Sequence, residues 1–247
     1  AALEVLNNSK TERVILVDER QNLGGELFNE FLSDDLAVSW HKDSIAKLLS
    51  FVEEENSRFT FLSRSTAYAW YDHNYIEVLE TNATGESLVT EKGQAARKTI
   101  HKIRAKEVIL ATGSHERPML FETNDLANIM LSQSMRRYLN EFGVVSGKDI
   151  ILYGNNDSIY SAAIDLNNQH INCSVVDVRS SELQGEIISK VKGLGIKVFQ
   201  GYTILKANGA HRVQGVEISK VEFKGKKWNV LGDSQKLKCD LLATSGG

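Results

Sequence analysis

The chain has 247 residues, of which 42% are hydrophobic and 25% are charged, and its formal net charge at pH 7 is −3. This composition is typical of a globular protein, and the weakly acidic charge gives no electrostatic attraction to nucleic acids or anionic membranes. No apolar run is long enough for a transmembrane helix, and no stretch has the pattern of a signal peptide. We therefore expect a cytoplasmic protein that has neither a nucleic acid nor a membrane as a partner.

The two cysteines, Cys173 and Cys239, lie far apart and do not form a C-x-x-C pair. Their separation argues against a redox-active vicinal disulfide and against a zinc or iron–sulfur site. We expect both to be small buried side chains in a reducing compartment. The six histidines also lack the spacing of metal ligands, and no nucleophile–base pair is visible. We therefore predict neither catalytic residues nor metal ligands in this chain.

The first half of the chain has the pattern of a helix, a buried strand, a second helix and a β-rich region. Residues 1–7 resemble the apolar end of a helix, and residues 13–18 (RVILVD) form the continuous apolar run of a buried parallel strand. A second helix is predicted over residues 44–55. Residues 59–80 and 98–105 favour β structure, with a polar loop between them.

The sequence VILATGSHERP, residues 108–118, places the only proline of the chain shortly after a glycine. Residues 108–111 favour β structure and are all apolar, which predicts a buried strand. Gly113 permits a turn that a Cβ would hinder, and Pro118 disfavours a helix just before it. A strand that ends in small residues is typical of a sheet edge approached by a ligand. An ordinary turn from strand to loop is the alternative.

The second half of the chain alternates strands with helices, which implies a mostly parallel, doubly wound sheet. We therefore predict an α/β fold with two dinucleotide-binding-type domains, residues 1–123 with 245–247 and residues 124–244. The expected helices span residues 132–142, capped by Gly143, 159–167 and 186–194, and the expected strands span residues 149–153, 172–178, 197–200, 213–219, 220–230 and 237–243.

Asp18 ends the first predicted strand, where dinucleotide-binding folds place an acid that hydrogen-bonds the adenosine ribose. Glu19 cannot point the same way, because neighbouring side chains of a strand face opposite sides, whereas Arg20 shares the face of Asp18. A carboxylate here would repel the 2′-phosphate of NADP, which favours NAD or FAD. The alternative is a strand that simply ends in solvated charges.

Two glycine-containing turns are candidates for contact with the diphosphate of such a cofactor. Gly24 and Gly25 would let the backbone pass close to it, and Thr112-Gly113-Ser114 would do the same from a neighbouring strand end. The Gly-rich loop that normally cradles the diphosphate would precede Ala1, so we expect a piece of a longer chain that lacks the first strand and this loop. The candidate cofactor-binding residues are Asp18, Glu19, Arg20, Gly24, Gly25, Thr112, Gly113 and Ser114.

The turn GNNDS, residues 154–158, is a degenerate form of the dinucleotide signature G-x-G-x-x-G. The first glycine is kept, but Asn156 and Ile159 occupy the second and third glycine positions. Asp157 would add a negative charge beside the diphosphate. We therefore predict a second domain that keeps the fold but binds no nucleotide, with Ser158 capping the following helix.

The segments ATGSHERPMLFETNDLANIMLSQSMRRYLNEFGV, YGNNDSIYSAAIDL and VVDVR closely resemble the α subunit of heterotetrameric sarcosine oxidase. The resemblance extends from VDERQNLGGEL to CDLLATSGG. ATGSHERP joined to the NNDS turn is more specific than the ATG and GG pieces, which many flavoproteins share. The resemblance implies the pyridine nucleotide-disulfide oxidoreductase-like superfamily, with two Rossmann-like domains of the thioredoxin reductase type and β-meanders.

In that family the complex oxidatively demethylates sarcosine to glycine, reduces O2 to hydrogen peroxide and transfers the one-carbon unit to tetrahydrofolate. The resemblance implies an NAD-binding module here, with FMN and FAD held mainly on the β subunit or its interface and the other subunits as partners. Asp18, Gly24, Gly25, Thr112 and Gly113 match the family's dinucleotide-contacting pattern. We expect this piece alone to be inactive and to bind NAD or FAD poorly.

Two other functions remain open at this stage. A subunit of an opine or amino-acid oxidase would hold FAD in the first domain, because NAD and FAD share the acid that binds the adenosine ribose. A non-catalytic scaffold module would bind partner subunits and no cofactor, as the degenerate turn at residues 154–158 would allow.

Overall fold

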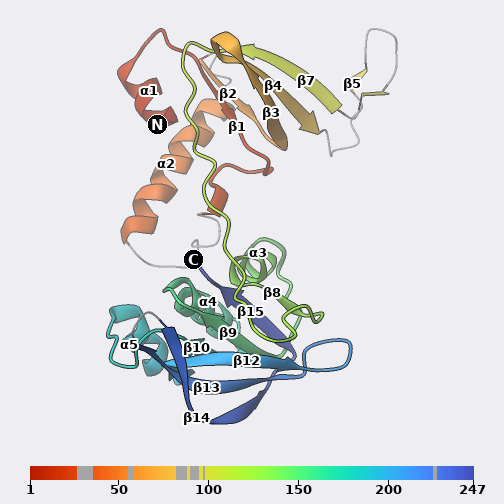
Figure 1. The fold of residues 1–247 in the computed structure, drawn as a ribbon. Coiled ribbons are helices and arrows are strands. Elements are labelled where there is room, and N and C mark those ends of the chain that lie inside the picture. Colours follow the sequence, from red (N-terminus) through yellow and green to blue (C-terminus); the bar gives the residue numbers. More distant parts are fainter. Residues whose placement is uncertain (27–35, 55–57, 82–87, 90–94, 97, 225–226) are drawn as a thin grey trace. The chain divides into compact units, whose positions relative to one another are not determined.

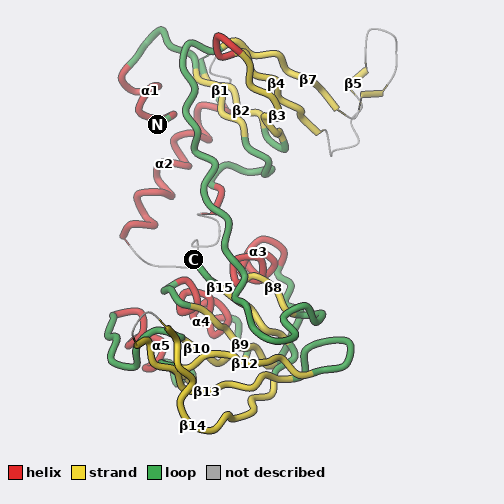
Figure 2. Tube along the Cα trace, viewed as in Figure 1, coloured by secondary structure: helices red, strands yellow, loops and turns green. Residues whose placement is uncertain are grey.

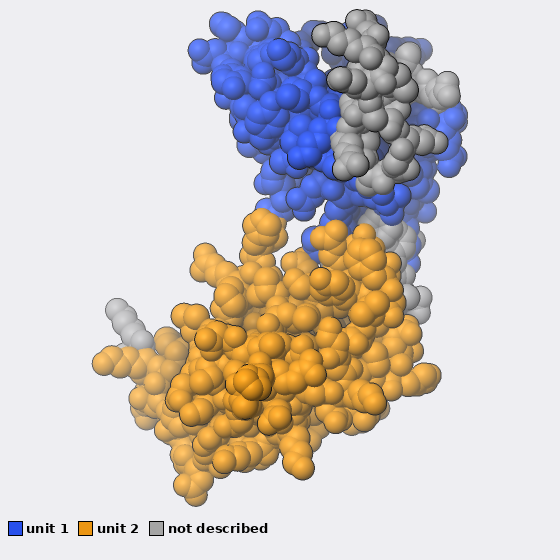
Figure 3. All heavy atoms as spheres, turned by 90° about the vertical axis from the view of Figure 1, so that its right-hand side faces the viewer, with its two compact units in different colours: residues 1–113 blue, residues 114–247 orange. Residues whose placement is uncertain are grey.

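The computed structural model forms two compact units, residues 1–113 and residues 114–247, shown in different colours in Figure 3. Each unit has its own sheets and its own buried residues. None of the helices in the described part of the chain is long and apolar enough to cross a membrane. The structure describes residues 1–26, 36–54, 58–81, 88–89, 95–96, 98–224 and 227–247.

The boundary between the units differs from the predicted domain boundary. We expected residues 1–123 and 245–247 to form the first domain, whereas the first unit ends at Gly113. Ser245 lies in the second unit, where it pairs with Gly154 in a parallel sheet. Residues 245–247 therefore lie in the second unit.

The first unit combines helices with one parallel pair of strands and an antiparallel sheet (Figure 1). Strand β1 pairs in parallel with β2, and β3, β4 and β7 form an antiparallel sheet in that order. The predicted second helix begins earlier than residue 44. The elements are α1 (Ala2–Asn8), β1 (Val14–Val17), α2 (Leu36–Glu53), β2 (Phe59–Leu62), β3 (Ser65–Tyr71), a 3-10 helix η2 (Asp72–Asn74), β4 (Tyr75–Thr81), β5 (Leu88–Val89), β6 (Ala95–Ala96) and β7 (Lys98–Arg104).

A small core joins the helices of the first unit to its parallel strands. Leu6 of α1, Ile45 of α2 and both ends of β2, Phe59 and Leu62, are buried. The register aligns Val14 with Phe59 and Val17 with Leu62, so the apolar run of β1 lies beside that of β2. Burial of these side chains holds β1 in place. The position of the turn that follows β1 is thereby fixed.

The prediction of a buried strand over residues 108–111 is wrong. Residues 107–121 form no helix or strand and are drawn as loop in Figure 2. The side chains of Ile109 and Leu110 are 64% and 68% exposed. An all-apolar strand is buried only where neighbouring strands pair with it and both faces are covered. In the described part of the first unit, β1 and β2 pair only with each other.

The second unit is built on a five-stranded parallel sheet in the order β11-β10-β9-β15-β8. The chain runs from β9 outward to β10 and β11, and it returns to the other side of β9 as β15. The α/β prediction is thereby confirmed. The elements are β8 (Ile129–Leu131), α3 (Ser132–Phe142), β9 (Asp149–Gly154), α4 (Ser158–Asn168), β10 (Asn172–Asp177), α5 (Glu186–Gly193), β11 (Lys197–Gln200), β12 (Tyr202–Asn208), β13 (Gly215–Lys224), β14 (Lys227–Lys238) and β15 (Leu241–Ser245).

Two hydrophobic layers cover the two faces of this parallel sheet. Side chains of α3, α4 and α5 pack on one face, with Ile150 and Leu152 of β9 among the sheet residues that they cover. The antiparallel meander β12–β13–β14 packs on the other face, over Ile151 and Tyr153. Successive residues of β9 thus enter opposite layers, which explains why its sequence is apolar from Ile150 to Tyr153.

Most predicted elements of the second unit are present, but the strands near its meander differ. Strand β12 was not predicted. A single residue, Gly201 (φ 73°), turns the chain between the end of β11 and the start of β12, so the sequence shows no longer loop that would separate the two strands. The last strand was placed at residues 237–243, whereas Leu237 belongs to β14 and β15 starts at Leu241. The carboxylate of Asp240 between them accepts the backbone N–H groups of Lys148 and Asp149. This contact creates the corner that divides the two strands.

Helix α3 is held against α4 by a buried ion pair. Its bounds match the prediction, and Gly143 ends it in the left-handed conformation (φ 65°). Arg136 Nε donates to Asp165 Oδ2 of α4 at 2.7 Å, and both side chains are almost fully buried. Asn140 Nδ2 donates to the same oxygen at 3.3 Å.

We predict that Asp165→Asn lowers the free energy of unfolding of the second unit by about 3–5 kcal/mol, because the substitution breaks the buried ion pair between Arg136 and Asp165. Urea denaturation followed by circular dichroism measures the change. Glu141→Gln is the matched control, since it removes the exposed Arg137–Glu141 pair of the same helix and should cost only about 0.3–0.5 kcal/mol. Equal effects of the two variants would contradict the prediction.

Candidate functional site

The turn after β1 holds the first group of predicted cofactor-binding residues. Asp18 directly follows the strand, and its backbone N–H donates to the carbonyl of Leu62 at 3.1 Å. Its carbonyl accepts the N–H of Ser65 at 2.8 Å. Asp18 Oδ1 accepts the N–H of Arg20 at 2.9 Å, while Glu19 is exposed. The acid is therefore held at the strand end by contacts on both its backbone and its side chain.

Arg20 connects this turn to the glycine loop. Its Nη1 donates to the carbonyl of Gly25 at 2.5 Å, and its Nη2 pairs with the carboxylate of Glu26. Gly24 and Gly25 have φ angles of 124° and 52°, which favour glycine. The guanidinium thus holds the glycine loop beside the end of β1. The sequence indicated which face Arg20 occupies, but it gave no sign of this contact with Gly25.

Thr112, Gly113 and Ser114 lie outside helices and strands, and all three are exposed. Gly113 has a φ of 70°, and a Cβ built on it would meet no atom within 4 Å. The backbone angle therefore favours glycine at position 113, whereas the space around it would admit a larger side chain. Thr112 and Gly113 end the first unit, whereas Ser114 starts the second.

The residues that follow this segment are tied to the second unit. Glu116 Oε2 accepts the N–H of Gln133 at 2.8 Å, in the first turn of α3. The N–H of Arg117 donates to the carbonyl of Gly247 at 3.1 Å, and the N–H of Gly246 donates to the carbonyl of Arg117 at 2.7 Å. Within the segment SHERP, Glu116 therefore caps helix α3 and Arg117 pairs with the backbone of Gly246 and Gly247. We had predicted neither contact from the amino-acid sequence.

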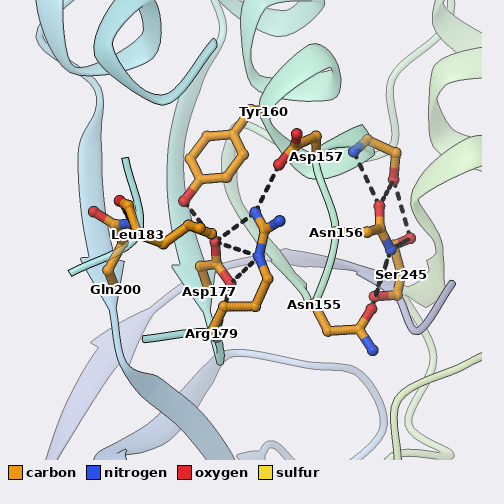
Figure 4. Close-up of polar contacts among 10 residues, drawn as sticks. Asn155, Asn156, Asp157, Tyr160, Asp177, Arg179, Leu183, Gln200 and Ser245 are labelled. Atoms are coloured by element: carbon orange, nitrogen blue, oxygen red, sulfur yellow. Dashed lines mark hydrogen bonds and ion pairs between the residues drawn. The ribbon is translucent and has the colours of Figure 1, made fainter. Parts of the chain in front are cut away.

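The second candidate turn, between β9 and α4, is closed by the end of β15 (Figure 4). A Cβ on Gly154 would lie 2.5 Å from the carbonyl oxygen of Ser245, so only glycine fits there. The N–H of Asn155 donates to the same carbonyl at 3.2 Å, and Asn155 Nδ2 donates to that of Gly246 at 3.3 Å. This is the edge of the sheet at which Rossmann-like folds bind their ligands.

Asn156 fills the space that a second glycine would leave bare. Its Nδ2 donates to Ser245 Oγ at 2.8 Å, and its Oδ1 accepts the N–H of Ser158 at 2.9 Å. The hydroxyl of Ser158 also donates to Asn156 Oδ1. The prediction that Ser158 caps the helix is therefore wrong. Helix α4 starts at Ser158 itself. The backbone N–H of Ser158, at the start of the helix, is accepted by Asn156 Oδ1.

Arg179 bridges two carboxylates across the same edge (Figure 4). Its Nε and Nη2 bind Asp177 Oδ1 and Oδ2 at 3.0 and 2.8 Å, and Nη2 also lies 2.8 Å from Asp157 Oδ1. Asp177 is fully buried, and Tyr160 donates its hydroxyl hydrogen to Asp177 Oδ2 at 2.7 Å. Asp177 ends β10, where a dinucleotide-binding fold would direct an acid at the ribose. Here Arg179 and Tyr160 of the same chain already bind the carboxylate of Asp177.

The charges of this cluster stabilise one another. Burial raises the pKa of Tyr160, and the hydrogen bond to Asp177 raises it further. Burial alone would lower the pKa of Arg179, but its bonds to Asp177 and Asp157 outweigh that effect and raise it. Tyr160 therefore stays neutral and Arg179 charged at physiological pH. Sequence reasoning missed both residues, although an acid at the end of β10 followed two positions later by arginine was a visible signal.

Neither cysteine has the properties of a reactive thiol. Burial raises the pKa of Cys173 to about 11 and that of Cys239 to about 12, and both cysteines are free. Both are therefore protonated at neutral pH, which makes them poor nucleophiles. Among the described residues, no three histidine, cysteine, aspartate or glutamate side chains are grouped to hold a metal ion.

Solved structures with a similar fold are named as a dehydrogenase and as reductases. L-proline dehydrogenase from P. horikoshii matches 100% of this chain and 39% of its own, with a TM-score of 0.60 and 18% identity. Thioredoxin reductase from T. acidophilum matches 95% and 69%, with a TM-score of 0.60 and 11% identity. An NAD-dependent persulfide reductase from A. fulgidus matches 100% and 43%, with a TM-score of 0.62 and 11% identity. At these identities the likeness concerns the fold.

Curated proteins give a closer match in sequence, although no family model matches the chain. The sarcosine oxidase α subunit of Corynebacterium sp. strain P-1 is 32% identical over 95% of this chain, and that of strain U-96 is 33% identical over 95%. The Rhizobium meliloti subunit is 32% identical over 62%. The chain spans about a quarter, 24%, of the length of the Corynebacterium subunits. The predicted resemblance is thereby confirmed: over nearly all its residues, this chain is similar to one segment of the sarcosine oxidase α subunit.

Proposed function

We propose that this chain is the dinucleotide-binding-type module of a sarcosine oxidase α-like subunit. The observation that carries the proposal is the 32–33% identity over 95% of the chain to two such subunits. The α/β topology of the second unit agrees with it, because the solved structures of this fold are named as oxidoreductases. In this proposal the chain is a component of an oxidoreductase, and we assign no catalytic role to the residues that the structure describes.

The reaction that we propose for the complete enzyme is the oxidative demethylation of sarcosine. Sarcosine loses its methyl group and becomes glycine, and the one-carbon unit leaves as methylenetetrahydrofolate. O2 takes up two electrons and two protons to become hydrogen peroxide. In this proposal FMN and FAD belong mainly to a partner subunit or its interface, and this chain contributes the NAD site.

Asp18 is the residue that we assign to NAD. A carboxylate has lone pairs for about four hydrogen bonds, so Asp18 can accept ribose hydroxyls while Oδ1 keeps the N–H of Arg20. Arg20 holds the Gly24–Gly25 loop next to this acid. Bare backbone there suits a diphosphate, which a side chain would push away. Thr112, Gly113 and Ser114 remain the second proposed contact.

The second unit serves as a scaffold in this proposal and binds no nucleotide. Asn156 fills the glycine position, and Arg179 engages the acid that would otherwise bind the ribose. Asp157 adds a negative charge at the edge where a diphosphate would lie. These three features act together against nucleotide binding.

FAD in the first unit is the second candidate, in a subunit of an opine or amino-acid oxidase. The same acid would hold the adenosine ribose of FAD, and L-proline dehydrogenase from P. horikoshii shares the fold. Mass spectrometry of the cofactor released from the full-length subunit, purified with its partners, decides between NAD and FAD.

We predict that Asp18→Asn weakens dinucleotide retention in the full-length subunit. A lost charge-assisted hydrogen bond is worth about 1.5–3 kcal/mol, or roughly 10- to 100-fold in affinity. The dinucleotide content of the purified complex measures the change. Glu19→Gln is the matched control, because this exposed neighbour loses the same charge one residue away. Equal dinucleotide content in both variants and in the wild type would exclude Asp18 as the ribose ligand.

We further predict that replacing Asn156 and Asp157 with glycine destabilises the second unit by about 1–2 kcal/mol. The variant loses the bonds of Asn156 and gains freedom in the unfolded chain. Activity per folded complex should stay unchanged. Thermal unfolding and steady-state turnover measure these two effects.

His170→Gly serves as the control for this variant. His170 has a φ of 58°, a backbone angle that already suits glycine, so its replacement should cost little. A crystal soaked with NAD that showed the dinucleotide lying across residues 154–158 would refute the scaffold role of the second unit.

A further inference from the structure

The turn after β1 carries two residues that favour different dinucleotides. Asp18 suits the ribose hydroxyls of NAD, whereas an arginine near this position is what related folds use to bind the 2′-phosphate of NADP. Arg20 follows Asp18 by two residues, and its backbone N–H donates to Asp18 Oδ1 at 2.9 Å. Its side chain therefore begins beside the place that we assign to the ribose. Which of the two residues decides the choice depends on what the guanidinium of Arg20 contacts.

The guanidinium of Arg20 is engaged within its own chain. Nη1 donates to the carbonyl of Gly25 at 2.5 Å, and Nη2 forms an ion pair with the carboxylate of Glu26. Arginine binds phosphate best through two parallel N–H bonds, and here both terminal nitrogens already have an acceptor. The side chain of Arg20 is 11% exposed and that of Glu26 is 49% exposed. The carboxylate is the more accessible member of the pair, and a phosphate would have to displace it to reach Nη2.

The ion pair also sets the charge that faces the ribose. With Glu26 in place, the positive charge of Arg20 is balanced, so the charge of Asp18 remains and repels a 2′-phosphate. Without the Glu26 carboxylate, the charge of Arg20 would instead offset that of Asp18. Charges interact more strongly where water has limited access, and the side chain of Arg20 is largely buried. Hydrogen bonding and charge therefore act in the same direction.

The backbone of this turn does not depend on Glu26. The carbonyl of Arg20 accepts the N–H of Arg64 at 2.9 Å, and that of Asp18 accepts the N–H of Ser65 at 2.8 Å. The bond from Arg20 Nη1 to the glycine loop does not involve the carboxylate either. Removing this carboxylate should therefore leave the turn and the glycine loop in place.

We propose that Glu26 selects NAD over NADP by holding the guanidinium of Arg20 away from the 2′-phosphate. The inference rests on the proposed function, in which Asp18 binds the adenosine ribose of NAD. It adds a specificity-determining residue that acts through Arg20 and need not touch the bound dinucleotide. The same site would accept NADP once Arg20 is released.

The test measures the ratio of NADP to NAD that the complex binds. The full-length subunit, purified with its partners, is dialysed against an equimolar mixture of the two dinucleotides until its content is constant, and the released cofactor is quantified by mass spectrometry. We expect Glu26→Ala to raise the ratio about tenfold or more, because a charge-assisted hydrogen bond becomes available to the 2′-phosphate. Glu26→Gln should give a smaller rise, since it removes the charge but keeps an acceptor for Nη2.

Glu12→Ala is the matched control. The side chain of Glu12 is 47% exposed and pairs with Lys106 at 3.3 Å in the same unit, so this variant also loses a half-exposed carboxylate and an ion pair. Its ratio of NADP to NAD should equal that of the wild type.

The double variant Glu26→Ala/Arg20→Gln tests whether Arg20 is the group that Glu26 controls. Its ratio should fall back to that of Arg20→Gln alone, because the guanidinium that would bind the 2′-phosphate is absent. NAD and NADP share the diphosphate, so any disturbance of the glycine loop weakens both and leaves the ratio as a measure of the 2′-phosphate contact.

The outcomes separate this inference from the proposed function. A wild-type complex that binds neither NAD nor NADP, or that holds FAD in their place, refutes the NAD site and this inference together. If the wild type binds NAD and Glu26→Ala leaves the ratio unchanged, only the inference fails. If Glu26→Ala does not assemble, Glu26→Gln keeps the length of the side chain, and a wild-type ratio in that variant refutes the inference.

Two further results would also overturn the inference. One is a rise in the ratio with Glu12→Ala as large as that with Glu26→Ala, which would show that any lost carboxylate has the same effect. The other is a rise that persists in the double variant without Arg20. That result would point to Arg64, the neighbouring guanidinium whose Nη2 donates to Gln21 Oε1 at 2.5 Å.

Discussion

The contact between Gly154 and Ser245 constrains the whole second unit. A carbonyl 2.5 Å from the place of a Cβ leaves room only for glycine, so β9 and β15 meet at their carboxyl ends without an intervening side chain. Parallel pairing then carries the residues after each strand to the same edge. Asn155 and Asn156 bind the backbone and hydroxyl of this edge. This is the edge at which Rossmann-like folds bind their ligands, and here amide side chains take up its space.

The two candidate turns use arginine in related ways with different results. In the first unit Arg20 binds the carbonyl of Gly25, and among the described residues the carboxylate of Asp18 accepts only the backbone N–H of that arginine. In the second unit Arg179 binds the acid itself in a bidentate manner, and Tyr160 adds a further hydrogen bond. Charge-assisted bidentate pairs are strong. Asp18 of the first turn can therefore accept further hydrogen bonds from a ligand. The acceptor sites of Asp177 in the second turn are already used by Arg179 and Tyr160.

The sequence predicted the elements whose signals are local. Helix α3 and its end at Gly143 follow from helical periodicity and a glycine cap, and β9 and β10 follow from apolar runs that end in turn residues. The strand expected at residues 108–111 failed because burial depends on neighbours that a local pattern does not contain. In the candidate site, Asp18 and the two glycines could be placed at a turn from their spacing. The bonds of Arg20, Glu116 and Arg179 could not, because they depend on backbone geometry or on partners distant in sequence.

The position of β15 in the sheet has a consequence for synthesis on the ribosome. Strand β8 lies at the edge of the parallel sheet and pairs there with β15, although more than a hundred residues separate the two strands in sequence. While residues 241–245 remain in the exit tunnel, β8 and one edge of β9 lack the strand that joins them. Contacts of such large sequence separation slow folding, and unpaired strand edges invite association between nascent chains. The nascent second unit therefore stays exposed to chaperones until its last strand emerges.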